Sequence, residues 1–477
     1  MKLDASILEK QKKVDEALID RLLNQEIKAS NVKIVVLDDD PTGVQTVHNV
    51  SVYTDWTKES IAKGFQETNN LFYILTNSRG FTVAQTEEAH RQIAQTVSET
   101  AAIQHKGYLL VSRSDSTLRG HYPLETETLK SVMEEQENKV IDGEILCPFF
   151  KEGQRFTLND IHYVRYGTEL IPAGETEFAK DKTFGYTSSD LKAYIEEKTQ
   201  GRYQKEKVVS ISLEELRNVN LDGITQKLME VKHFNKVVVN AVDDVDVKVF
   251  CIALYRAMSM GKTYLFRTAA SFVKALGGIT TRELLTKEDM VKKQNANGGI
   301  VVVGSHTDKT TRQLEELKKV QNVECIEFNS DLVLDPKAFE EEIQTVLKKE
   351  EQILKDGKTV VIYTKRKLLV VAEDSEEDAL VRSVKISDAV QSLVGKLNVE
   401  PQFVIAKGGI TSSDVGTKAL AVKRATVLGQ IRPGIPVWET GSESKFPNVP
   451  YVIFPGNVGE DTTLREAVEV FCGKKNA

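Results

Sequence analysis

Short runs of apolar, often β-branched residues alternate along most of the chain with charged segments. The runs that predict strands in the first half lie at residues 33–37, 50–54, 71–76, 107–111, 144–149, 208–212, 236–241 and 263–268. Between them, segments such as 85–100 and 125–137 repeat apolar residues with the period of a helix. Near-continuous apolar strands separated by amphipathic helices are typical of mostly parallel sheets covered on both faces. The pattern therefore predicts an α/β protein.

The alternation is interrupted near residue 290. Residues 280–299 end in a polar Asn/Gly cluster that is typical of a linker, and a second series of apolar runs begins directly after it. We therefore predict two domains, residues 1–290 and residues 291–477, each with a mostly parallel or mixed sheet flanked by helices. At ~150 residues per domain the length is compatible with this division.

Two segments of the first domain stand out from the alternation. Apolar residues of residues 1–30 fall near one helical face, which predicts an additional N-terminal helix. Residues 153–184 are rich in Gly, Pro and polar residues and show little periodicity. Such a long excursion is equally compatible with a surface insertion and with a loop that lines a binding site.

The composition excludes several classes of protein. Lys and Arg total 63 against 70 Asp and Glu, a net charge of −7, whereas sequence-independent nucleic-acid binding needs a basic surface. No apolar run reaches the ~18 residues of a membrane span, and the N-terminal segment lacks the apolar core of a secretory signal. Four widely spaced cysteines without a C-x-x-C pair favour a reducing compartment. We expect a cytoplasmic protein that binds neither nucleic acid nor membranes. The oligomeric state stays open, a homodimer included.

A cluster of acidic residues follows the first predicted strand. Asp38, Asp39 and Asp40 precede Thr42 and Gly43, and ligands of open α/β sheets bind at the carboxyl ends of the strands. Adjacent carboxylates repel one another unless a cation or polyol hydroxyls bridge them. The cluster is therefore a candidate binding site. The alternative is a solvated turn in which one Asp caps the next helix.

Two further polar clusters follow predicted strands, at residues 76–81 (TNSRGF) and 112–121 (SRSDSTLRGH). The planar guanidinium of Arg matches a carboxylate or a phosphate, Ser and Thr hydroxyls can bind sugar hydroxyls, and Asp can accept a proton from an attacking alcohol. Because neighbouring strands would bring these ends together, the clusters predict a pocket for a small, hydroxylated anion. The alternative is an Arg–Asp surface pair beside ordinary Ser/Thr turns.

Three glycine-containing turns join a predicted strand to a predicted helix in the second half, at residues 304–305, 408–413 and 456–459. Unpaired backbone N–H groups and the helix dipole make such turns favourable for phosphate oxygens. One turn is weak evidence, since α/β proteins need Gly turns anyway, but three in one domain favour nucleotide binding. No G-x-G-x-x-G follows a strand, so the dinucleotide fingerprint is absent.

These motifs, in this order, resemble those of the four-carbon acid sugar kinase family. The similar stretches are DDPTG (39–43), TNSR (76–79), DSTLRG (115–120), GS with TxxQ (304–305, 310–313), GGITS (408–412), PGIP (433–436) and GNVG (456–459). A looser match to a Pro-Gly-Arg stretch includes Arg155. Ile410 stands in place of an acidic residue, Val458 in place of an aromatic one, and Pro41 in place of an apolar one.

The resemblance implies an ATP-dependent, Mg²⁺-using kinase with its active site in an inter-domain cleft. It would phosphorylate the terminal hydroxyl of a small sugar acid of the threonate, erythronate or 3-oxo-tetronate type. Asp115 and Asp40 are the implied catalytic candidates, which orient or deprotonate that hydroxyl. The implied substrate-binding residues are Asp39, Arg79, Ser116, Thr117, Arg119 and Arg155. The implied ATP-binding residues are Ser305, Gly408, Gly409, Ile410, Thr411, Gly456, Asn457, Val458 and Gly459.

Three alternatives remain open at the level of the sequence. The first is a kinase of a related five-carbon branched sugar acid, because the departures from the family pattern leave the particular acid undetermined. The second is a nicotinamide-dependent sugar-acid dehydrogenase, which the missing dinucleotide fingerprint disfavours. The third is a non-catalytic sensor of a sugar acid or nucleotide, with which Ile410 is compatible.

Overall fold

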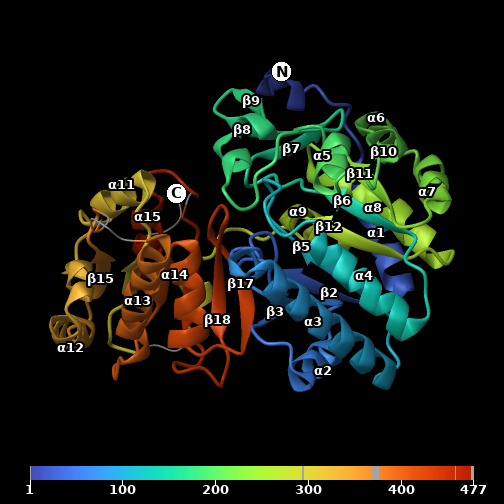
Figure 1. Cartoon of the computed structure of the whole chain (residues 1–477). Helices are drawn as coiled ribbons and strands as arrows, with labels where there is room; N and C mark the ends of the chain where they lie inside the picture. Colours follow the sequence, from blue (N-terminus) through green and yellow to red (C-terminus); the bar gives the residue numbers. More distant parts are fainter. Residues whose placement is uncertain are drawn as a thin grey trace. The chain divides into compact units, whose positions relative to one another are not determined.

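The computed structural model describes residues 2–473 except residues 293, 294, 368, 370, 372–374 and 457. The chain divides into two compact units. Unit 1 contains residues 1–43 and 55–280, and unit 2 contains residues 44–54 and 281–477. Each unit has a sheet flanked by helices (Figure 1), which confirms the predicted two-part α/β class. The transfer of residues 44–54 to the second unit is a feature that no pattern in the sequence indicates.

The sheet of unit 1 is parallel throughout its described pairings. Its strand order is β10 (Val209–Ile211), β11 (Asn235–Val239), β6 (Gly143–Cys147), β12 (Tyr264–Thr268), β5 (Tyr108–Arg113), β2 (Lys33–Asp38) and β4 (Leu71–Leu75). Seven of the eight strands predicted in the first half are thereby confirmed, whereas the run at residues 50–54 forms a strand of unit 2. All residues of β2, β4, β6 and β12 are buried, as expected for parallel strands covered on both faces.

The helices of unit 1 connect successive parallel strands or cover them. They are α1 (Glu16–Ser30), α2 (Lys58–Gln66), α3 (Val83–Ile103), α4 (Leu124–Glu137), α5 (Leu191–Lys198), α6 (Leu213–Arg217), α7 (Leu221–Glu230), α8 (Asp244–Ser259) and α9 (Ala270–Leu276). Both α3 and α4 begin directly after polar clusters that follow strands. The substrate candidates therefore lie at strand-to-helix turns.

The predicted helix over residues 1–30 is wrong in its first half. Residues 3–4 form a short strand, β1 (Leu3–Asp4), and α1 begins only at Glu16. Two capping residues divide the segment, because Asp4 accepts the N–H of Ser6 while Asp15 accepts the N–H of Leu18. The helix that does form packs on α8.

The excursion at residues 153–184 contains regular structure that the sequence did not reveal. It forms a small antiparallel sheet, β1–β9–β8–β7, from β7 (Arg155–Leu158), β8 (Ile161–Tyr166) and β9 (Glu169–Pro172). Two 3₁₀ turns follow, η3 (Ala173–Glu175) and η4 (Glu177–Lys180). Arg155 is therefore fixed at the start of a strand.

Unit 2 has a mixed sheet. Its order is β3 (Val50–Tyr53), β17 (Arg424–Arg432), β18 (Ile435–Thr440), β19 (Pro450–Phe454), β16 (Val404–Lys407), β13 (Ile300–Val303), β15 (Thr359–Thr364) and β14 (Val323–Phe328). The pairings from β3 to β19 are antiparallel, and those from β19 to β14 are parallel. The three candidate phosphate turns follow β13, β16 and β19, which are neighbours.

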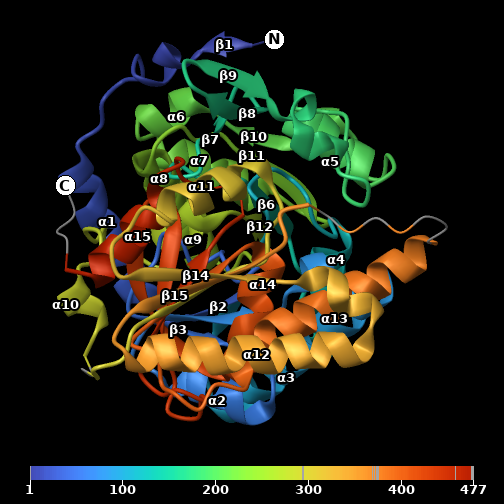
Figure 2. The ribbon, with the colours of Figure 1, turned by 90° about the vertical axis from the view of Figure 1, so that its left-hand side faces the viewer.

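The helices of unit 2 are α10 (Lys287–Met290), α11 (Asp308–Leu317), α12 (Pro336–Lys355), α13 (Glu376–Gly395), α14 (Gly409–Asp414) and α15 (Thr463–Phe471). Helices α12 and α13 lie side by side (Figure 2), and α12 packs on β14 and β15. Within the residues that the structure describes, no helix combines the length and apolar character needed to cross a membrane.

Candidate active site

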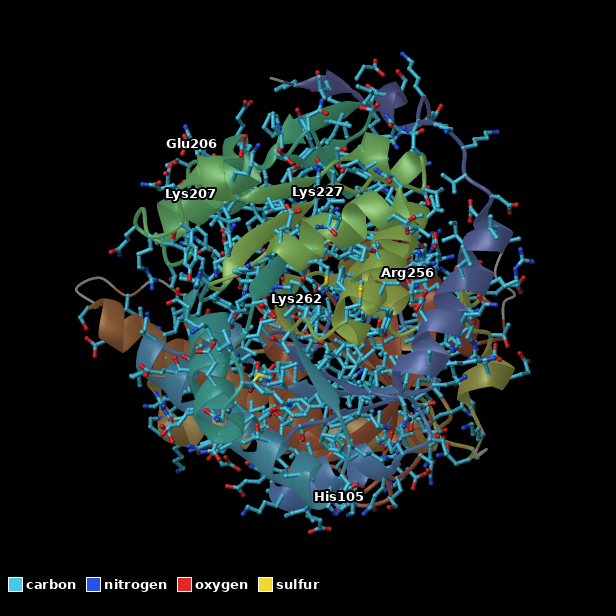
Figure 3. The ribbon with its side chains drawn as sticks, turned by 90° about the vertical axis from the view of Figure 1, so that its right-hand side faces the viewer. His105, Glu206, Lys207, Lys227, Arg256 and Lys262 are labelled. Atoms are coloured by element: carbon cyan, nitrogen blue, oxygen red, sulfur yellow. The ribbon has the colours of Figure 1, made fainter. Side chains whose placement is uncertain are left out.

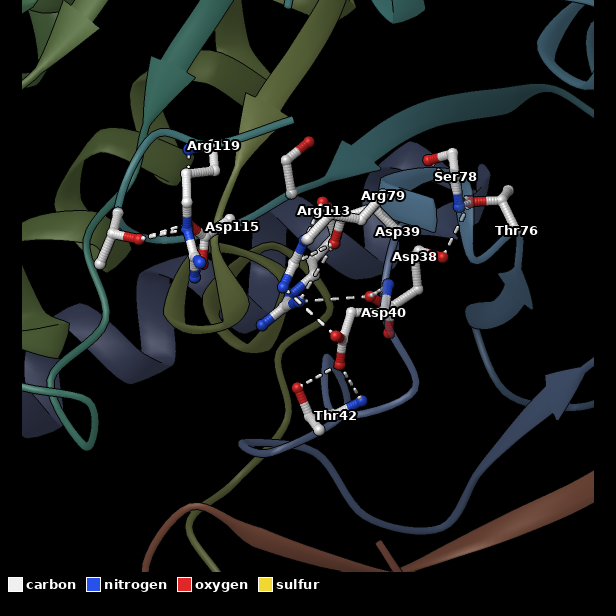
Figure 4. Close-up of polar contacts among 12 residues, drawn as sticks. Asp38, Asp39, Asp40, Thr42, Thr76, Ser78, Arg79, Arg113, Asp115 and Arg119 are labelled. Atoms are coloured by element: carbon white, nitrogen blue, oxygen red, sulfur yellow. Dashed lines mark hydrogen bonds and ion pairs between the residues drawn. The ribbon is translucent and has the colours of Figure 1, made fainter. Parts of the chain in front are cut away.

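The polar clusters of unit 1 meet because their strands are neighbours. In the parallel register, Asp38 at the end of β2 is paired with Leu75 of β4 and with Arg113 of β5. The backbone continues the contact beyond the strands, since the N–H of Thr76 donates to the carbonyl of Asp38 at 2.9 Å. Figure 4 shows the resulting group of side chains. Strand order thus brings together what the sequence separates.

Two arginines neutralise the adjacent aspartates. Arg79 Nη2 lies 2.6 Å from Asp39 Oδ1, and Arg79 Nη1 lies 3.2 Å from Asp40 Oδ2. Arg113 Nη1 lies 3.3 Å from Asp38 Oδ1 (Figure 4). The cations that the acidic cluster requires are therefore supplied by the chain itself.

The aspartates of this cluster differ in protonation tendency. Burial raises the pKa of Asp38 to about 8 and also raises the pKa of Asp39. Burial acts in the same direction on Asp40, but Arg79 and hydrogen bonds from Thr42 outweigh it and hold the pKa of Asp40 below its ordinary value. Asp40 therefore remains an ionised acceptor at neutral pH.

Asp115 forms a second acidic centre in the loop after β5. Its Oδ2 accepts a hydrogen bond from Arg119 Nε at 2.8 Å and another from the hydroxyl of Thr117. Burial opposes the charged form, but Arg79 and Arg119 together hold the pKa of Asp115 well below its usual range. An ionised carboxylate of this kind suits the orientation of a hydroxyl group better than the storage of a proton.

Each backbone carbonyl of residues 115–119 accepts a hydrogen bond from a side chain elsewhere in unit 1. The hydrogen bonds are Arg267 Nη1 to Asp115 O (3.2 Å), His162 Nε2 to Ser116 O (2.7 Å), Tyr186 OH to Thr117 O (2.7 Å), Tyr194 OH to Leu118 O (2.9 Å) and Arg267 Nη2 to Arg119 O (2.9 Å). Leu118 has a φ of +71°, a conformation that persists only where surrounding contacts stabilise it. The loop is therefore strongly positioned.

Sequence reasoning missed these supporting side chains. Arg267 is the penultimate residue of β12, a neighbour of β5, so only strand order brings it to the loop. Tyr186 and Tyr194 come from segments beyond the small antiparallel sheet, and nothing in their local pattern indicates the contact. A further missed residue is Glu125, a buried carboxylate that accepts a hydrogen bond from Ser78 Oγ at 2.9 Å.

Arg119 and Arg155 share an aromatic platform. Their Cζ atoms lie 5.2 Å and 5.4 Å, respectively, from the ring centroid of Phe178, a residue of η4. The sequence offered only the unpatterned excursion as a signal for Phe178. The structure thus brings Arg155 close to Arg119 of the Asp115 loop.

Arg155 differs from the other arginines of the site. Arg79, Arg113 and Arg119 each form an ion pair with an aspartate. Among the described residues no ion pair is formed by Arg155, and its buried Nε has no hydrogen-bond partner. Burial also lowers the pKa of Arg155, an unfavourable effect that a bound anion would relieve.

The three glycine turns of unit 2 lie close together. A Cβ atom on Gly304 would stand 2.3 Å from Thr411 Oγ1, and one on Gly408 would stand 3.2 Å from Ser305 Cβ. A Cβ atom on Gly456 of the third turn would stand 3.9 Å from Ser305 Oγ. Gly408 also has a φ of +119°, a backbone conformation that residues other than glycine rarely adopt. Glycine is needed here because the turns approach each other closely.

Two side chains donate hydrogen bonds to backbone carbonyl groups at the third turn. Lys407 Nζ donates to Pro455 O at 2.6 Å and to Gly456 O at 3.1 Å, while Gln313 Nε2 donates to Val458 O at 3.2 Å. Burial lowers the pKa of Lys407 to about 7. Sequence reasoning missed Lys407, which reads only as the end of an apolar strand.

The remaining ATP-binding candidates have different placements. Gly409, Ile410 and Thr411 begin the short helix α14, and the side chain of Ile410 is 75% exposed. Val458 packs against the hydrophobic core of unit 2. Asn457 lies outside the described residues.

Comparisons with known proteins follow the same division of the chain. Residues 34–276 match a sugar-binding N-terminal domain, and residues 300–464 match a nucleotide-binding C-terminal domain. The protein is therefore of the class that binds a sugar in one domain and a nucleotide in the other. The chain belongs to the family with this two-domain architecture, that of the four-carbon acid sugar kinases.

Solved structures show the same fold. The chain is 16% identical to the Haemophilus influenzae protein HI1011, which is assigned to DUF1537, with 92% of this chain and 100% of that one covered and a TM-score of 0.60. It is 15% identical to a protein from Salmonella typhimurium LT2 described as a candidate tRNA synthase, with 91% and 98% covered and a TM-score of 0.64. At these identities the likeness shows the fold alone. No curated protein matches the chain.

Proposed function

We propose that the protein is an ATP-dependent kinase that phosphorylates the terminal hydroxyl of a small sugar acid of the threonate, erythronate or 3-oxo-tetronate type. The observation that carries this proposal is the unpaired guanidinium of Arg155 beside an ionised Asp115 and the hydroxyls of its loop. A cation that lacks an anion, next to groups that bind hydroxyls, fits a hydroxylated carboxylate.

The three candidate arginines, Arg79, Arg119 and Arg155, differ in their contacts. Arg79 and Arg119 already bind aspartates, so we assign the substrate carboxylate to Arg155. Ser116 and Thr117 would bind hydroxyl groups of the acid, together with Asp39. Asp115 or Asp40 would orient the attacking hydroxyl, and the lowered pKa of each carboxyl is compatible with this role.

The nucleotide would bind at the clustered turns of unit 2. Ser305, Gly408–Thr411 and Gly456–Gly459 would surround the phosphates with backbone N–H groups and hydroxyls. No group of three or more His, Cys, Asp or Glu side chains suited to a metal ion occurs among the described residues. This is compatible with Mg²⁺ that arrives on ATP, because Mg²⁺ is held largely by phosphates and water and offsets the phosphate charge.

The direct test is incubation of the full chain with Mg-ATP and a panel of four- and five-carbon sugar acids. ADP release that depends on one acid supports the kinase, and a five-carbon preference would identify the related substrate class. NAD reduction with an acid would instead show a dehydrogenase, and saturable binding without turnover would show a sensor. Either of the last two results contradicts the proposal.

The assignment of Arg155 has its own test. Arg155→Gln should raise KM for the acid at least tenfold, which corresponds to a loss of about 1.4 kcal/mol of binding free energy. KM for ATP should stay within about twofold. Arg165→Gln is the matched control, because Arg165 lies on β8 of the same small sheet and donates to Gly167 O. An equal effect of the two substitutions would contradict the assignment.

A further inference from the structure

A cavity of about 830 Å³ opens in unit 1 where its parallel strands begin. Its walls come from the last turns of α1, α3, α4 and α8 and from the first residues of β5 and β12. The strand ends that carry Asp38 and Arg113 are at the other edge of the same sheet. Figure 3 labels two lining residues, His105 and Lys262. The volume falls within the roughly 300–1,000 Å³ of small-molecule sites.

Much of the lining is apolar. Met133, Met258 and Leu109 contribute side chains from three different elements. Tyr255 and Tyr264 donate their hydroxyls to the carbonyls of Leu276 and Leu228, each at 2.7 Å. Because these hydroxyls are engaged within the protein, the rings are what the two tyrosines offer to a ligand.

The charged side chains of the lining already have partners. The pairs are Glu137 with Lys139 (3.0 Å), Glu26 with Arg256 (2.9 Å) and Lys262 with Asp142 (2.9 Å), and Lys106 Nζ donates to Phe65 O (2.6 Å). An ionic ligand would have to compete with these pairs and lose its own hydration. The charge distribution therefore favours an uncharged ligand.

The carboxylate of Glu137 retains hydrogen-bonding capacity. Glu137 Oε1 accepts hydrogen bonds from Ser98 Oγ, at 3.0 Å, and from Tyr108 OH, while Oε2 pairs with Lys139. An ionised carboxylate offers about four acceptor positions, so a further donor can be accommodated. A ligand hydroxyl or N–H is the complementary group.

We propose that this cavity is a second ligand site, which binds an uncharged, mainly aromatic small molecule that carries one hydrogen-bond donor. The site is separate from the proposed kinase chemistry, and none of its lining residues belongs to the substrate or nucleotide candidates. Strand β5 joins it to the Asp115 loop, because Tyr108 begins the strand and Arg113 ends it. Helix α4 runs back in the opposite direction, from Leu124 near the loop to Glu137 in the cavity.

The test is calorimetric titration of the full chain, without ATP or sugar acid, with 2-naphthol as the probe. This molecule has an apolar two-ring body, no charge and one hydroxyl donor. We expect saturable 1:1 binding, and at least tenfold weaker binding of the anionic 2-naphthoate and of the cationic naphthylmethylammonium. Absence of saturable binding, or equal affinity for a charged analogue, overturns the proposal.

Cavity-filling variants locate the binding. Ala102→Trp on α3 and Gln136→Trp on α4 introduce bulk from two separate walls, and both positions are exposed, so that folding should be retained. Each should weaken 2-naphthol binding at least tenfold. Ala84→Trp is the matched control, because Ala84 is also exposed and lies at the other end of α3. Unchanged binding by both filling variants would place the probe elsewhere and overturn the proposal.

Discussion

The hydroxyl of Tyr194 makes a single hydrogen bond to the loop that carries Asp115, and a conservative substitution can remove it. It donates to the carbonyl of Leu118, the residue with a φ of +71°, at 2.9 Å. Tyr194→Phe deletes this one hydrogen bond and retains the ring, which stacks on Tyr122 with centroids 5.7 Å apart. The substitution therefore tests whether the pinned backbone positions the substrate loop.

The expected magnitude follows from burial. Tyr194 is fully buried, so Leu118 O would lose its donor in a place that water reaches poorly. A buried polar group without a partner costs about 1–3 kcal/mol. At about 2–4 °C per kcal/mol, Tm should fall by several degrees. If the loss destabilises the binding conformation of the loop by about 1–2 kcal/mol, affinity for the sugar acid should fall about 5–30-fold.

Tyr255→Phe is the matched control for this substitution. Tyr255 is also buried, and its hydroxyl donates to a backbone carbonyl, Leu276 O, at 2.7 Å, but this contact is not made to the loop. Thermal unfolding should show similar losses for both variants, whereas steady-state kinetics should show a raised KM for the acid only in Tyr194→Phe. Equal acid KM values in the two variants would refute the positioning role.

Further predictions concern both ligands. Arg119→Ala removes the 2.8 Å partner of Asp115 and should weaken sugar-acid binding about tenfold or more in calorimetry, while nucleotide binding stays intact; normal acid binding would contradict the pocket assignment. Lys407 has a pKa near 7, so its side chain is mostly neutral at pH 8. Because the negative charge of a bound phosphate favours the protonated form of Lys407, ATP binding at pH 8 should be accompanied by the uptake of a proton. The affinity for ATP should then weaken as the pH rises further. Titrations in buffers of different ionisation enthalpy should show this uptake and its loss in Lys407→Met; uptake that persists there excludes Lys407. Gly304→Ala should lower Tm and nucleotide affinity, because its Cβ would stand 2.3 Å from Thr411 Oγ1; thermal unfolding of a double variant with Thr411→Ala should recover stability if that contact is the cause.

The sequence predicted the parallel core well because burial on both faces leaves a plain signature. Strands such as β2 and β4 are apolar at nearly every position, and the turns after them carry the polar residues. The small sheet of β7 to β9 was missed for the opposite reason. Its strands are short, antiparallel and partly exposed, so their polar residues hide the period.

The candidate site was predictable only in its local part. Asp115 and Arg119 are neighbours in one turn, so a motif can present both. Arg267, Tyr186 and Tyr194 support that turn through hydrogen bonds to backbone carbonyls. Because every residue has a backbone carbonyl, no residue type in the turn indicates these contacts. The pairing state of Arg155 likewise depends on which aspartates the other arginines occupy, which strand order decides.

The assignment of residues 44–54 to unit 2 affects how the chain can be divided. Strand β3 pairs with β17 from Val50 opposite Val427 to Tyr53 opposite Arg424, and Gln45 Nε2 donates to Gly434 O at 3.1 Å. A fragment that starts at residue 281 would lack this strand and expose the backbone edge of β17, a ready template for association with other chains. No single cut separates the two units, so fragments made for separate study should supply residues 44–54 to the second one.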